Sequence, residues 1–397
     1  MRTDRILIPE GFEFSTAKAG FKYKNRDDLG FIYSDKPAAG AGVFTQNKFR
    51  AAPVLVAQKL LEQQYLRGIV INSGQANACT GEEGRNICHR TLEIVAEKFD
   101  LEKENILPAS TGVIGEQIDL ELWEFAVNDL YANRNKKSPL DVAKAITTTD
   151  KFPKLLAKSC YLGGQEVKIL GMAKGAGMIC PNMATMLGFV CCDARIGPHD
   201  LQDILENSVE KSFNRISIDG DTSTNDCVLA LANGAGNGIV ESSEHKRIMQ
   251  ETFLELLQDL AYLIVQDAEG GTKVVRVSIH NAASRREAES AARTIGHSPL
   301  VKTAIHGLDP NWGRIVAALG RSQADFDPEK ISVYVAGIVL FQYGRPVQED
   351  MDSLLAPYLR RDDISIQVDL AAGSEYYELL TSDLSCEYVS INAEYRS

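Results

Sequence analysis

The chain has 397 residues, enough for two ordinary domains or one large α/β unit, and 44% apolar with 24% charged residues is typical of a globular protein. Its formal net charge of −12 argues against a nucleic-acid partner, because phosphates require clusters of Lys and Arg. The eight cysteines form no CxxC pair and no zinc-ligand spacing, so no metal site is expected. The N-terminal segment lacks the apolar region of a signal peptide and no run reaches a membrane-spanning length, which predicts a cytoplasmic protein with reduced thiols and no membrane contact.

The first 115 residues are predicted to form short strands separated by turns. Apolar runs bounded by Gly, Pro and Asp indicate strands within 1–60 and at 68–72, with a turn at 37–40. A loop is expected at 73–77, followed by an amphipathic helix at 81–100. A second glycine-bearing loop is expected at 108–115.

Helices and strands alternate through the rest of the chain. Apolar periodicity predicts a hairpin that turns at Gly163–Gly164, together with helices at 119–132, 140–146, 199–213, 246–268 and 282–295, and strands at 187–193 and 273–280. The polar segment 219–226 lacks the glutamate spacing of an EF-hand, so we expect a functional loop without a metal. No repeat, low-complexity segment or flexible linker is found.

The segment Ala173–Leu187, AKGAGMICPNMATML, combines features that packing alone does not require. A lysine lies among small residues, glycines permit unusual backbone angles, and Pro181 restricts the residue before it. Thr185 then places a hydroxyl inside an apolar run. From these residues alone, a glycine-rich turn leading into a core strand, with Thr185 simply buried, is the simpler interpretation.

This segment resembles the self-cleavage motif of the ornithine acetyltransferase family, also called the glutamate N-acetyltransferases, of arginine biosynthesis. Many spaced motifs in one order make the resemblance specific, and it extends from the N-terminal segment to Ser397. The motifs are TQNKFRAAPV (45–54), INSGQANACTG (71–81), PASTGVIG (108–115), TTTDKFPK (147–154), DGDTSTND (219–226), DAEGGTK (267–273), SPLVKTAIHGLDPNWGRI (298–315) and INAEYRS (391–397).

The resemblance implies that the chain cuts its own bond between Ala184 and Thr185, giving an alpha chain of residues 1–184 and a beta chain of residues 185–397. The Thr185 hydroxyl would attack the Ala184 carbonyl, and water would then release the new terminus. The freed α-amine, with an ordinary pKa of about 8, could serve as the base for the Thr185 hydroxyl. The enzyme would then move acetyl from N²-acetyl-L-ornithine to L-glutamate by a ping-pong path through acetyl-Thr185.

The resemblance also implies roles for four charged or hydrogen-bonding groups. Thr111 and Gly112 would stabilise the oxyanion, although without the family this triplet would be a plain connecting loop. Lys174 is the candidate for the substrate α-carboxylate, although a surface lysine is the commonest fate of that residue type. Glu269 is the candidate for the ammonium of ornithine. A carboxylate just past a helix end opposes the helix dipole, which hints that it is kept for a purpose.

Three further substrate contacts are implied near the middle and the end of the chain. One of Thr148 and Thr149 would bind substrate, and the choice between them stays open because Lys151 stands where many relatives carry another threonine. Asn392 and Ser397 match the remaining contacts of the family, with a serine in place of a threonine at the last position.

The implied fold is α/β, a mixed-sheet α/β sandwich of the self-processing N-terminal-nucleophile aminopeptidase-like type. The substrates are small molecules and no cofactor is expected, although acetyl-CoA serves as a second acetyl donor in some relatives. The two cleaved chains would stay together, and two such pairs would form a heterotetramer. Two other hypotheses remain: an autoprocessed amidohydrolase or aminopeptidase that passes the acyl group to water, and a non-enzymatic binding protein in which Thr185 is buried filler.

Overall fold

The computed structural model describes residues 6–63, 65–180, 186–347 and 350–394, which form two compact units. The first unit covers the chain up to Asn214 together with Asp221–Ile264. The second covers Arg215–Gly220 and the chain from Val265 onward. These units therefore follow packing rather than the predicted division at Ala184–Thr185, a bond that lies outside the described residues.

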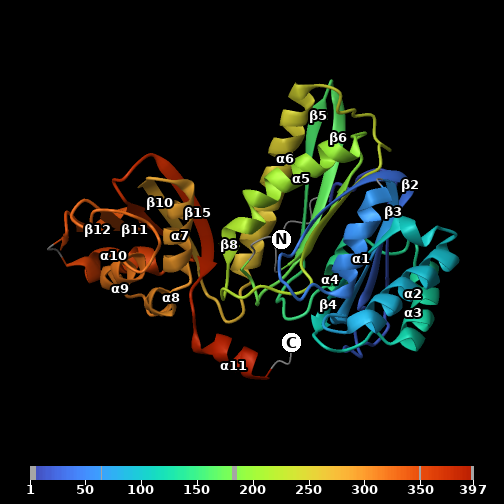
Figure 1. Ribbon diagram of the computed structural model, residues 1–397, viewed down its shortest axis with the longest axis horizontal. Helices are drawn as coiled ribbons and strands as arrows, with labels where there is room; N and C mark the ends of the chain where they lie inside the picture. The colour runs from blue at the N-terminus through green and yellow to red at the C-terminus, as the bar shows by residue number, and fades with distance from the viewer. Residues whose placement is uncertain (1–5, 64, 181–185, 348–349, 395–397) are drawn as a thin grey trace. The chain divides into compact units, whose positions relative to one another are not determined.

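A mixed eight-stranded sheet forms the centre of the first unit (Figure 1). Its order is β4–β3–β2–β9–β7–β6–β5, with β1 paired to β2. The pairs β3–β4 and β7–β9 are parallel, and the others are antiparallel. The strands are β1 Phe12–Ala17, β2 Leu29–Phe44, β3 Tyr65–Gln75, β4 Ile106–Val113, β5 Lys154–Leu162, β6 Gln165–Lys174, β7 Leu187–Cys192 and β9 Cys227–Ala232.

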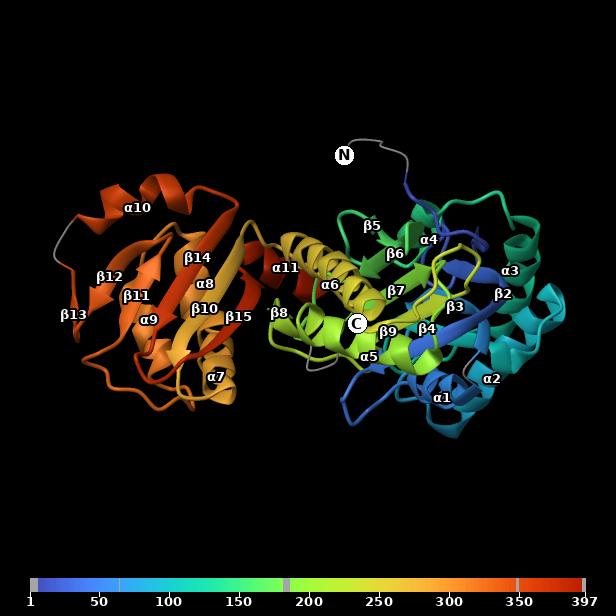
Figure 2. The same ribbon diagram turned by 90° about the horizontal axis from the view of Figure 1, so that it is seen from above.

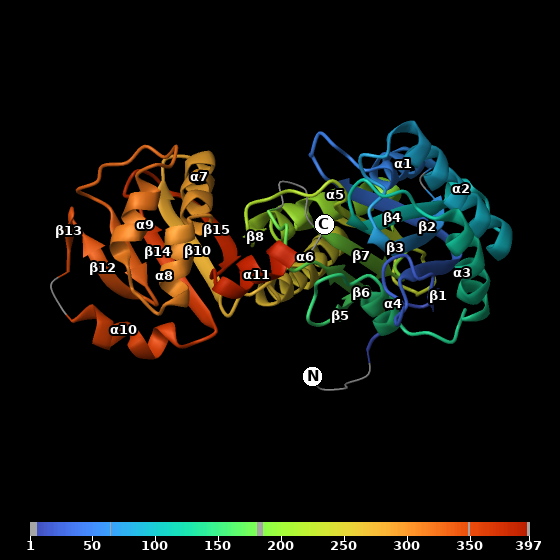
Figure 3. The same cartoon turned by 90° about the horizontal axis from the view of Figure 1, so that it is seen from below.

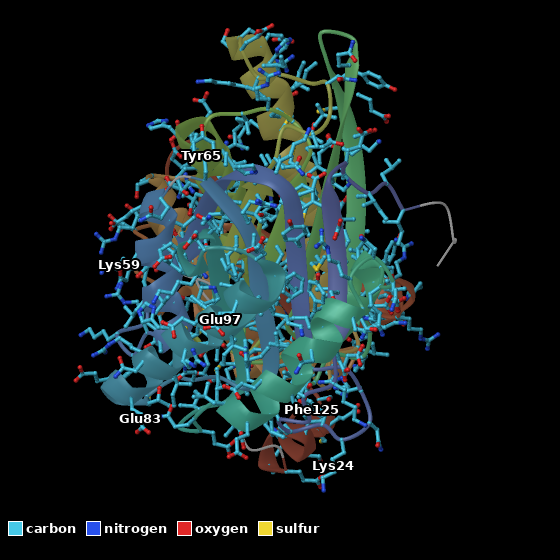
Figure 4. All side chains as sticks on the ribbon, turned by 90° about the vertical axis from the view of Figure 1, so that its right-hand side faces the viewer. Lys24, Lys59, Tyr65, Glu83, Glu97 and Phe125 are labelled. Carbon is cyan, nitrogen blue, oxygen red and sulfur yellow. The ribbon has the colours of Figure 1, made fainter. Side chains whose placement is uncertain are left out.

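Helices cover both faces of this sheet, so every residue of the central strands β7 and β9 is buried. Met172, Phe189 and Leu229 belong to a core shared with α1 Ala52–Leu60, α2 Gly81–Phe99, α3 Leu120–Ala132 and α4 Pro139–Ala145. Gly171 points to the opposite face, where an added Cβ would lie 2.8 Å from Leu260 of α6 Ser243–Gln266. Helix α5, Pro198–Glu210, packs on β2 and β9. Figure 4 shows the outward side chains of this unit, with Lys59 of α1, Glu83 and Glu97 of α2 and Phe125 of α3 among the exposed ones.

A second mixed sheet, of seven strands, forms the centre of the second unit (Figure 2). Its order is β13–β12–β11–β14–β10–β15–β8, with β10–β14 and β15–β8 parallel. The buried residues Val275, Val277 and Ile279 of β10 share a core with helix α7, while Arg276 between them is exposed, as strand alternation requires. The bounds are β8 Ile216–Ser217, β10 Val274–Ala282, β11 Ser332–Val335, β12 Ile338–Gln342, β13 Arg345–Pro346, β14 Asp363–Asp369, β15 Glu375–Ser382, α7 Arg285–Gly296, α8 Pro299–His306, α9 Trp312–Leu319, α10 Met351–Leu359 and α11 Cys386–Glu394.

The predicted α/β class with mixed sheets is confirmed, and so is the hairpin at Gly163–Gly164. Both glycines have positive φ, at 56° and 83°, which suits the two-residue turn between β5 and β6. The predicted helices are present within a few residues of their expected ends. Among the described residues, no helix has the length and apolar character needed to cross a bilayer.

Three local predictions are wrong. The expected turn at 37–40 lies inside β2, whose pairing with β3 shifts register between Tyr33 and Ala38, so Pro37 is tolerated at an irregular point of the ladder. The expected loops at 73–77 and 108–115 are largely strand, because β3 and β4 pair in parallel as far as Gln75 and Val113. Helix α1 was not predicted, since residues 1–60 were expected to form short strands; Pro53 lies in its first turn, where proline is favoured.

Candidate active site

The predicted site residues of the first unit meet where β6 ends and β7 begins. The described chain resumes at Met186, directly after Thr185, and the Met186 carbonyl accepts a hydrogen bond from Cys227 N at 3.2 Å. Leu187 is the register partner of Lys174 on one side and of Cys227 on the other. The end of β6 and the start of β7, on either side of the predicted cleavage point, therefore lie beside the start of β9. Thr185 and Ala184 themselves lie outside the described residues.

Thr111 and Gly112 lie in β4, directly opposite Ser73 and Gly74 of β3. Gly112 has φ of +134°, and a Cβ there would lie 2.2 Å from the backbone carbon of Gly74. Only glycine permits both this backbone angle and this approach. The two strands are thus held close at the point where the sequence predicts backbone donors for an oxyanion.

Lys174 reaches the same point from β6. Its Nζ donates to Thr111 Oγ1 at 3.4 Å, and the side chain is half-buried. The structure therefore brings together two residues that are 63 positions apart and that the sequence assigned to the oxyanion and to the substrate carboxylate. A half-buried ammonium beside Thr111 makes this end of the sheet suitable for negatively charged groups.

Asn225 was not identified from the sequence, although it lies in the polar segment 219–226. It is 4% exposed, and its Nδ2 donates to Ala76 O at 2.6 Å and to Ser110 O at 2.9 Å. Its Oδ1 accepts from Thr224 Oγ1 at 2.7 Å. One amide thus joins the start of β9 to the residue before Thr111. The only sequence signal in 219–226 was a run of polar residues without apolar periodicity, and such a run does not single out one residue.

Asp150, within the motif TTTDKFPK, is a second residue that was not identified from the sequence. Its side chain is fully buried and accepts from Lys154 Nζ and from Gly175 N, both at 2.7 Å, and from Thr148 N at 3.0 Å. Burial alone would raise the pKa of Asp150, but the charges of Lys174 and Lys154 outweigh it and lower that pKa to about 2. The Asp150 carboxylate therefore links the turn at Thr148 to the backbone of Gly175.

Thr148 and Thr149 are both half-buried on this turn. Their neighbour Thr147 is buried, with its hydroxyl donating to Lys144 O and accepting from Arg26 Nη1. The turn is therefore anchored on both sides. The choice between Thr148 and Thr149 as the substrate contact stays open.

Glu269 and Asn392 are brought together in the second unit, where α11 follows β15 (Figure 3). Asn392 Nδ2 donates to Glu269 Oε2 at 2.9 Å and to Tyr388 O at 3.0 Å, and Glu269 is 7% exposed. A Cβ on Gly270 would lie 2.3 Å from Tyr388 N, and Ser385 Oγ donates to Gly270 O at 2.6 Å. Helix α11 thus packs tightly against the segment that carries Glu269. Ser397 lies outside the described residues.

A cluster at the start of α5 has side chains that could in principle hold a metal ion. The ligand atoms of His199, Asp200 and Asp203 lie within 4.8 Å of one another. His199 and Asp203 are exposed, Asp200 pairs with Lys246, and His199 pairs with Asp203. The arrangement is that of ordinary surface ion pairs.

Comparisons with known proteins converge on one family. A family model described as the ArgJ family matches residues 13–397. The "Arginine biosynthesis bifunctional protein ArgJ" of Nitratidesulfovibrio vulgaris is 50% identical over 98% of this chain and 99% of that protein. A mitochondrial protein of the same description from Dictyostelium discoideum is 41% identical over 98% of this chain and 93% of its own. The crystal structure of the Bacillus halodurans protein is 38% identical, with a TM-score of 0.50, over 53% of this chain and 100% of that one.

Proposed function

Because the chain belongs to the ArgJ family, we propose that it transfers an acetyl group from N²-acetylornithine to glutamate in arginine biosynthesis. The observation that carries this function is the full-length match to curated relatives, together with Lys174 and Thr111 meeting beside the strand that begins after Thr185. The relatives are described as bifunctional, which supports a second activity that acetylates an amino acid from another donor.

The proposed mechanism begins with the Thr185 α-amine accepting the proton of its own hydroxyl. The hydroxyl oxygen attacks the acetyl carbonyl of acetylornithine, and donors at Thr111 and Gly112 stabilise the oxyanion. Ornithine leaves with the proton that the amine held, so acetyl-Thr185 remains. The glutamate amine then attacks this ester, the Thr185 hydroxyl is restored, and N-acetylglutamate leaves. Lys174 orients the α-carboxylate and Glu269 holds the ornithine ammonium.

Self-cleavage between Ala184 and Thr185 is part of the proposal, since the α-amine of Thr185 exists only after that bond is cut. The length of a solved relative supports it. The Bacillus halodurans chain is covered completely by 53% of this chain, whereas the curated relatives align over nearly their full length. A chain of about half length is what cleavage near the middle of the precursor would leave.

The remaining elements of the proposal concern partners and place. The alpha and beta chains stay associated, because strands β6 and β7, on either side of the cleavage point, are neighbours in one sheet. Two such pairs form a heterotetramer in the cytoplasm. The proposed chemistry needs no metal or prosthetic group, since the hydroxyl, the amine and the backbone donors supply nucleophile, base and oxyanion site.

An exchange assay tests this function against the hydrolase alternative. Purified protein is incubated with acetylornithine, with and without glutamate, and ornithine release is measured. We expect release to depend on glutamate and to be matched by N-acetylglutamate. Equal release without glutamate, with acetate as product, would identify an amidohydrolase and contradict the proposal.

Replacing Glu269 by glutamine should weaken the use of ornithine compounds and leave self-cleavage unchanged. A hydrogen bond to a charged partner contributes about 1.5–3 kcal/mol, so we expect the Michaelis constant for acetylornithine to rise about 10–100-fold. The measurement is steady-state kinetics beside gel analysis of cleavage. Glu375→Gln, at an exposed position of β15, is the matched control and should behave as wild type. Equal loss of cleavage and transfer would count against the assigned role.

Replacing Asn225 by aspartate should slow both self-cleavage and acetyl transfer. The variant keeps the side-chain shape but loses the donors to Ser110 O and Ala76 O and places a carboxylate against two carbonyls. A displacement of 1 Å at a reacting site costs about 100-fold in rate, so we expect kcat to fall by about that factor with little change in the Michaelis constants. Asn207→Asp, on the exposed side of α5, is the control. Unchanged kcat would show that Asn225 does not position the oxyanion strand.

A further inference from the structure

A hollow lined by three cationic side chains and an exposed aromatic ring lies on the surface of the first unit. Its volume is about 210 Å³, and Lys48, Phe49, Arg50, Thr80, Gly81 and Arg85 are among the residues that line it. Phe49 is 71% exposed, the highest value among the large apolar side chains that the structure describes. A ring exposed to this extent among cations is free to stack on a planar ligand.

The three cations have no acidic partner among the residues that the structure describes. Within the described part of the chain, Lys48, Arg50 and Arg85 form no ion pair, and Arg50 donates only to the neutral Gln58 Oε1 at 3.4 Å. Some other cations of this acidic protein are paired, as Arg247 is with Glu244 and Glu251. Glu82 and Glu83 begin α2 nearby, but neither lines the hollow. An unpaired cluster of three cations is suited to an anionic ligand of more than one charge.

Both walls of the hollow are connected to the oxyanion strand. On one side, Ala51 N donates to Thr224 O at 2.9 Å, and the next residue, Asn225, holds Ser110 O. On the other side, the segment that ends in Thr80 and Gly81 passes Ala78, whose carbonyl accepts from Gly115 N at 2.9 Å. Hydrogen-bonded segments therefore connect both walls of the hollow to β4, and its lining residues differ from those assigned to acyl transfer.

We propose that this hollow binds the nucleotide end of acetyl-coenzyme A. Adenine stacks on Phe49, and the phosphates pair with Lys48, Arg50 and Arg85. An aromatic ring among cations is the chemistry that recognises an adenine nucleotide, since each stacked base contributes about 1–3 kcal/mol. Acetylornithine and glutamate offer neither a base nor several phosphates. The flexible pantetheine arm would carry the thioester from the hollow toward Thr185.

This inference rests on the proposed function, because both acetyl donors would load the same threonine. The Thr185 oxygen forms a bond to the thioester carbonyl carbon and the carbon–sulfur bond breaks. Coenzyme A leaves as a thiol with the proton that the Thr185 amine took from the hydroxyl. The resulting acetyl-Thr185 is the intermediate that acetylornithine also forms, so glutamate accepts acetyl from either donor by one path.

The double variant Arg50→Ala/Arg85→Ala tests the site in the full, cleaved enzyme, with Phe49→Ala as an independent second variant. We expect the Michaelis constant for acetyl-CoA to rise at least tenfold in each, while kinetics with acetylornithine stay within twofold of wild type. Adenosine 3′,5′-bisphosphate should compete with acetyl-CoA in the wild type and lose that effect in the variants. The charge-matched control Lys24→Ala/Lys36→Ala, at exposed positions of the same unit, should change neither activity.

Two outcomes would overturn this site, and both differ from failure of the proposed function. The first concerns the double variant and Phe49→Ala: either the Michaelis constant for acetyl-CoA is unchanged, or activity falls equally with acetyl-CoA and with acetylornithine. The second is a wild-type enzyme that exchanges acetyl between ornithine and glutamate but neither uses acetyl-CoA nor binds coenzyme A in calorimetry. In both cases the wild type would still exchange acetyl between ornithine and glutamate, whereas loss of that exchange in the wild type would refute the function itself.

Discussion

Replacing Thr185 by alanine is expected to leave one intact chain of 43.5 kDa and to abolish acetyl transfer. Without the hydroxyl, no group can attack the Ala184 carbonyl, so no new α-amine appears and no acyl intermediate forms. Intact-mass analysis of purified protein measures the first effect, and acetylornithine–glutamate exchange measures the second. The wild type should give two fragments, ending at Ala184 and beginning at Thr185.

Two further variants make this prediction sharper. Thr185→Ser keeps a hydroxyl and should still cleave. Thr294→Ala removes a threonine hydroxyl from α7 of the second unit, outside the family motifs, and should also cleave fully. A wild-type preparation that is active while unbroken after Ala184 would contradict the mechanism. Cleavage in Thr185→Ala would show that another residue supplies the nucleophile.

Replacing Asp150 by asparagine is expected to lower the free energy of unfolding by about 3–5 kcal/mol, because the variant leaves the ammonium of Lys154 buried without its counter-charge. Both side chains of this pair are 0% exposed, so solvent cannot compensate the loss. The measurement is urea unfolding in a Thr185→Ala background, where a single uncleaved chain avoids dissociation of the two fragments during the transition. Transfer activity, measured in cleaved Asp150→Asn, should fall as well, since the Thr148 turn and Gly175 lose their common acceptor.

The exposed pair between Arg247 and Glu251 provides the control for this prediction. Glu251→Gln should leave the free energy of unfolding nearly unchanged, because solvent screens that pair. A loss of similar size in Asp150→Asn would mean that the buried pair adds little to stability.

The pH dependence of the same variant gives a second check. Because the pKa of Asp150 is lowered to about 2 in the folded protein, its contribution is present above the ordinary carboxyl value of about 4. It is lost as the pH falls from about 4 toward 2, when the carboxylate takes up a proton. The difference in unfolding free energy between the parent and Asp150→Asn should therefore shrink over that window. If the difference in unfolding free energy stays constant with pH, the lowered pKa of Asp150 is contradicted.

The amino-acid sequence by itself determined the family, and through the family it predicted the reacting residues. The motifs from TQNKFRAAPV to INAEYRS occur in one order along the whole chain, and the family match over residues 13–397 agrees with them. Periodicity also located most helices, because an amphipathic stripe is a local property of the chain. Local pattern failed at 108–115, where glycines that indicate a loop instead allow β3 and β4 to approach each other.

Only the tertiary structure decided which polar residues support the site. Asp150 and Asn225 lie in segments that looked merely polar, and their importance comes from partners 25 and 115 positions away, Gly175 and Ser110. Such partners cannot be found from local spacing, because a buried hydrogen bond depends on which strands the sheet places side by side. The cationic hollow has the same origin, since Arg50 and Arg85 become neighbours only when α1 packs beside the start of α2. The reacting residues can be predicted from residue type and motif order. The hydrogen bonds that hold the site and the surface that binds a ligand depend on long-range packing.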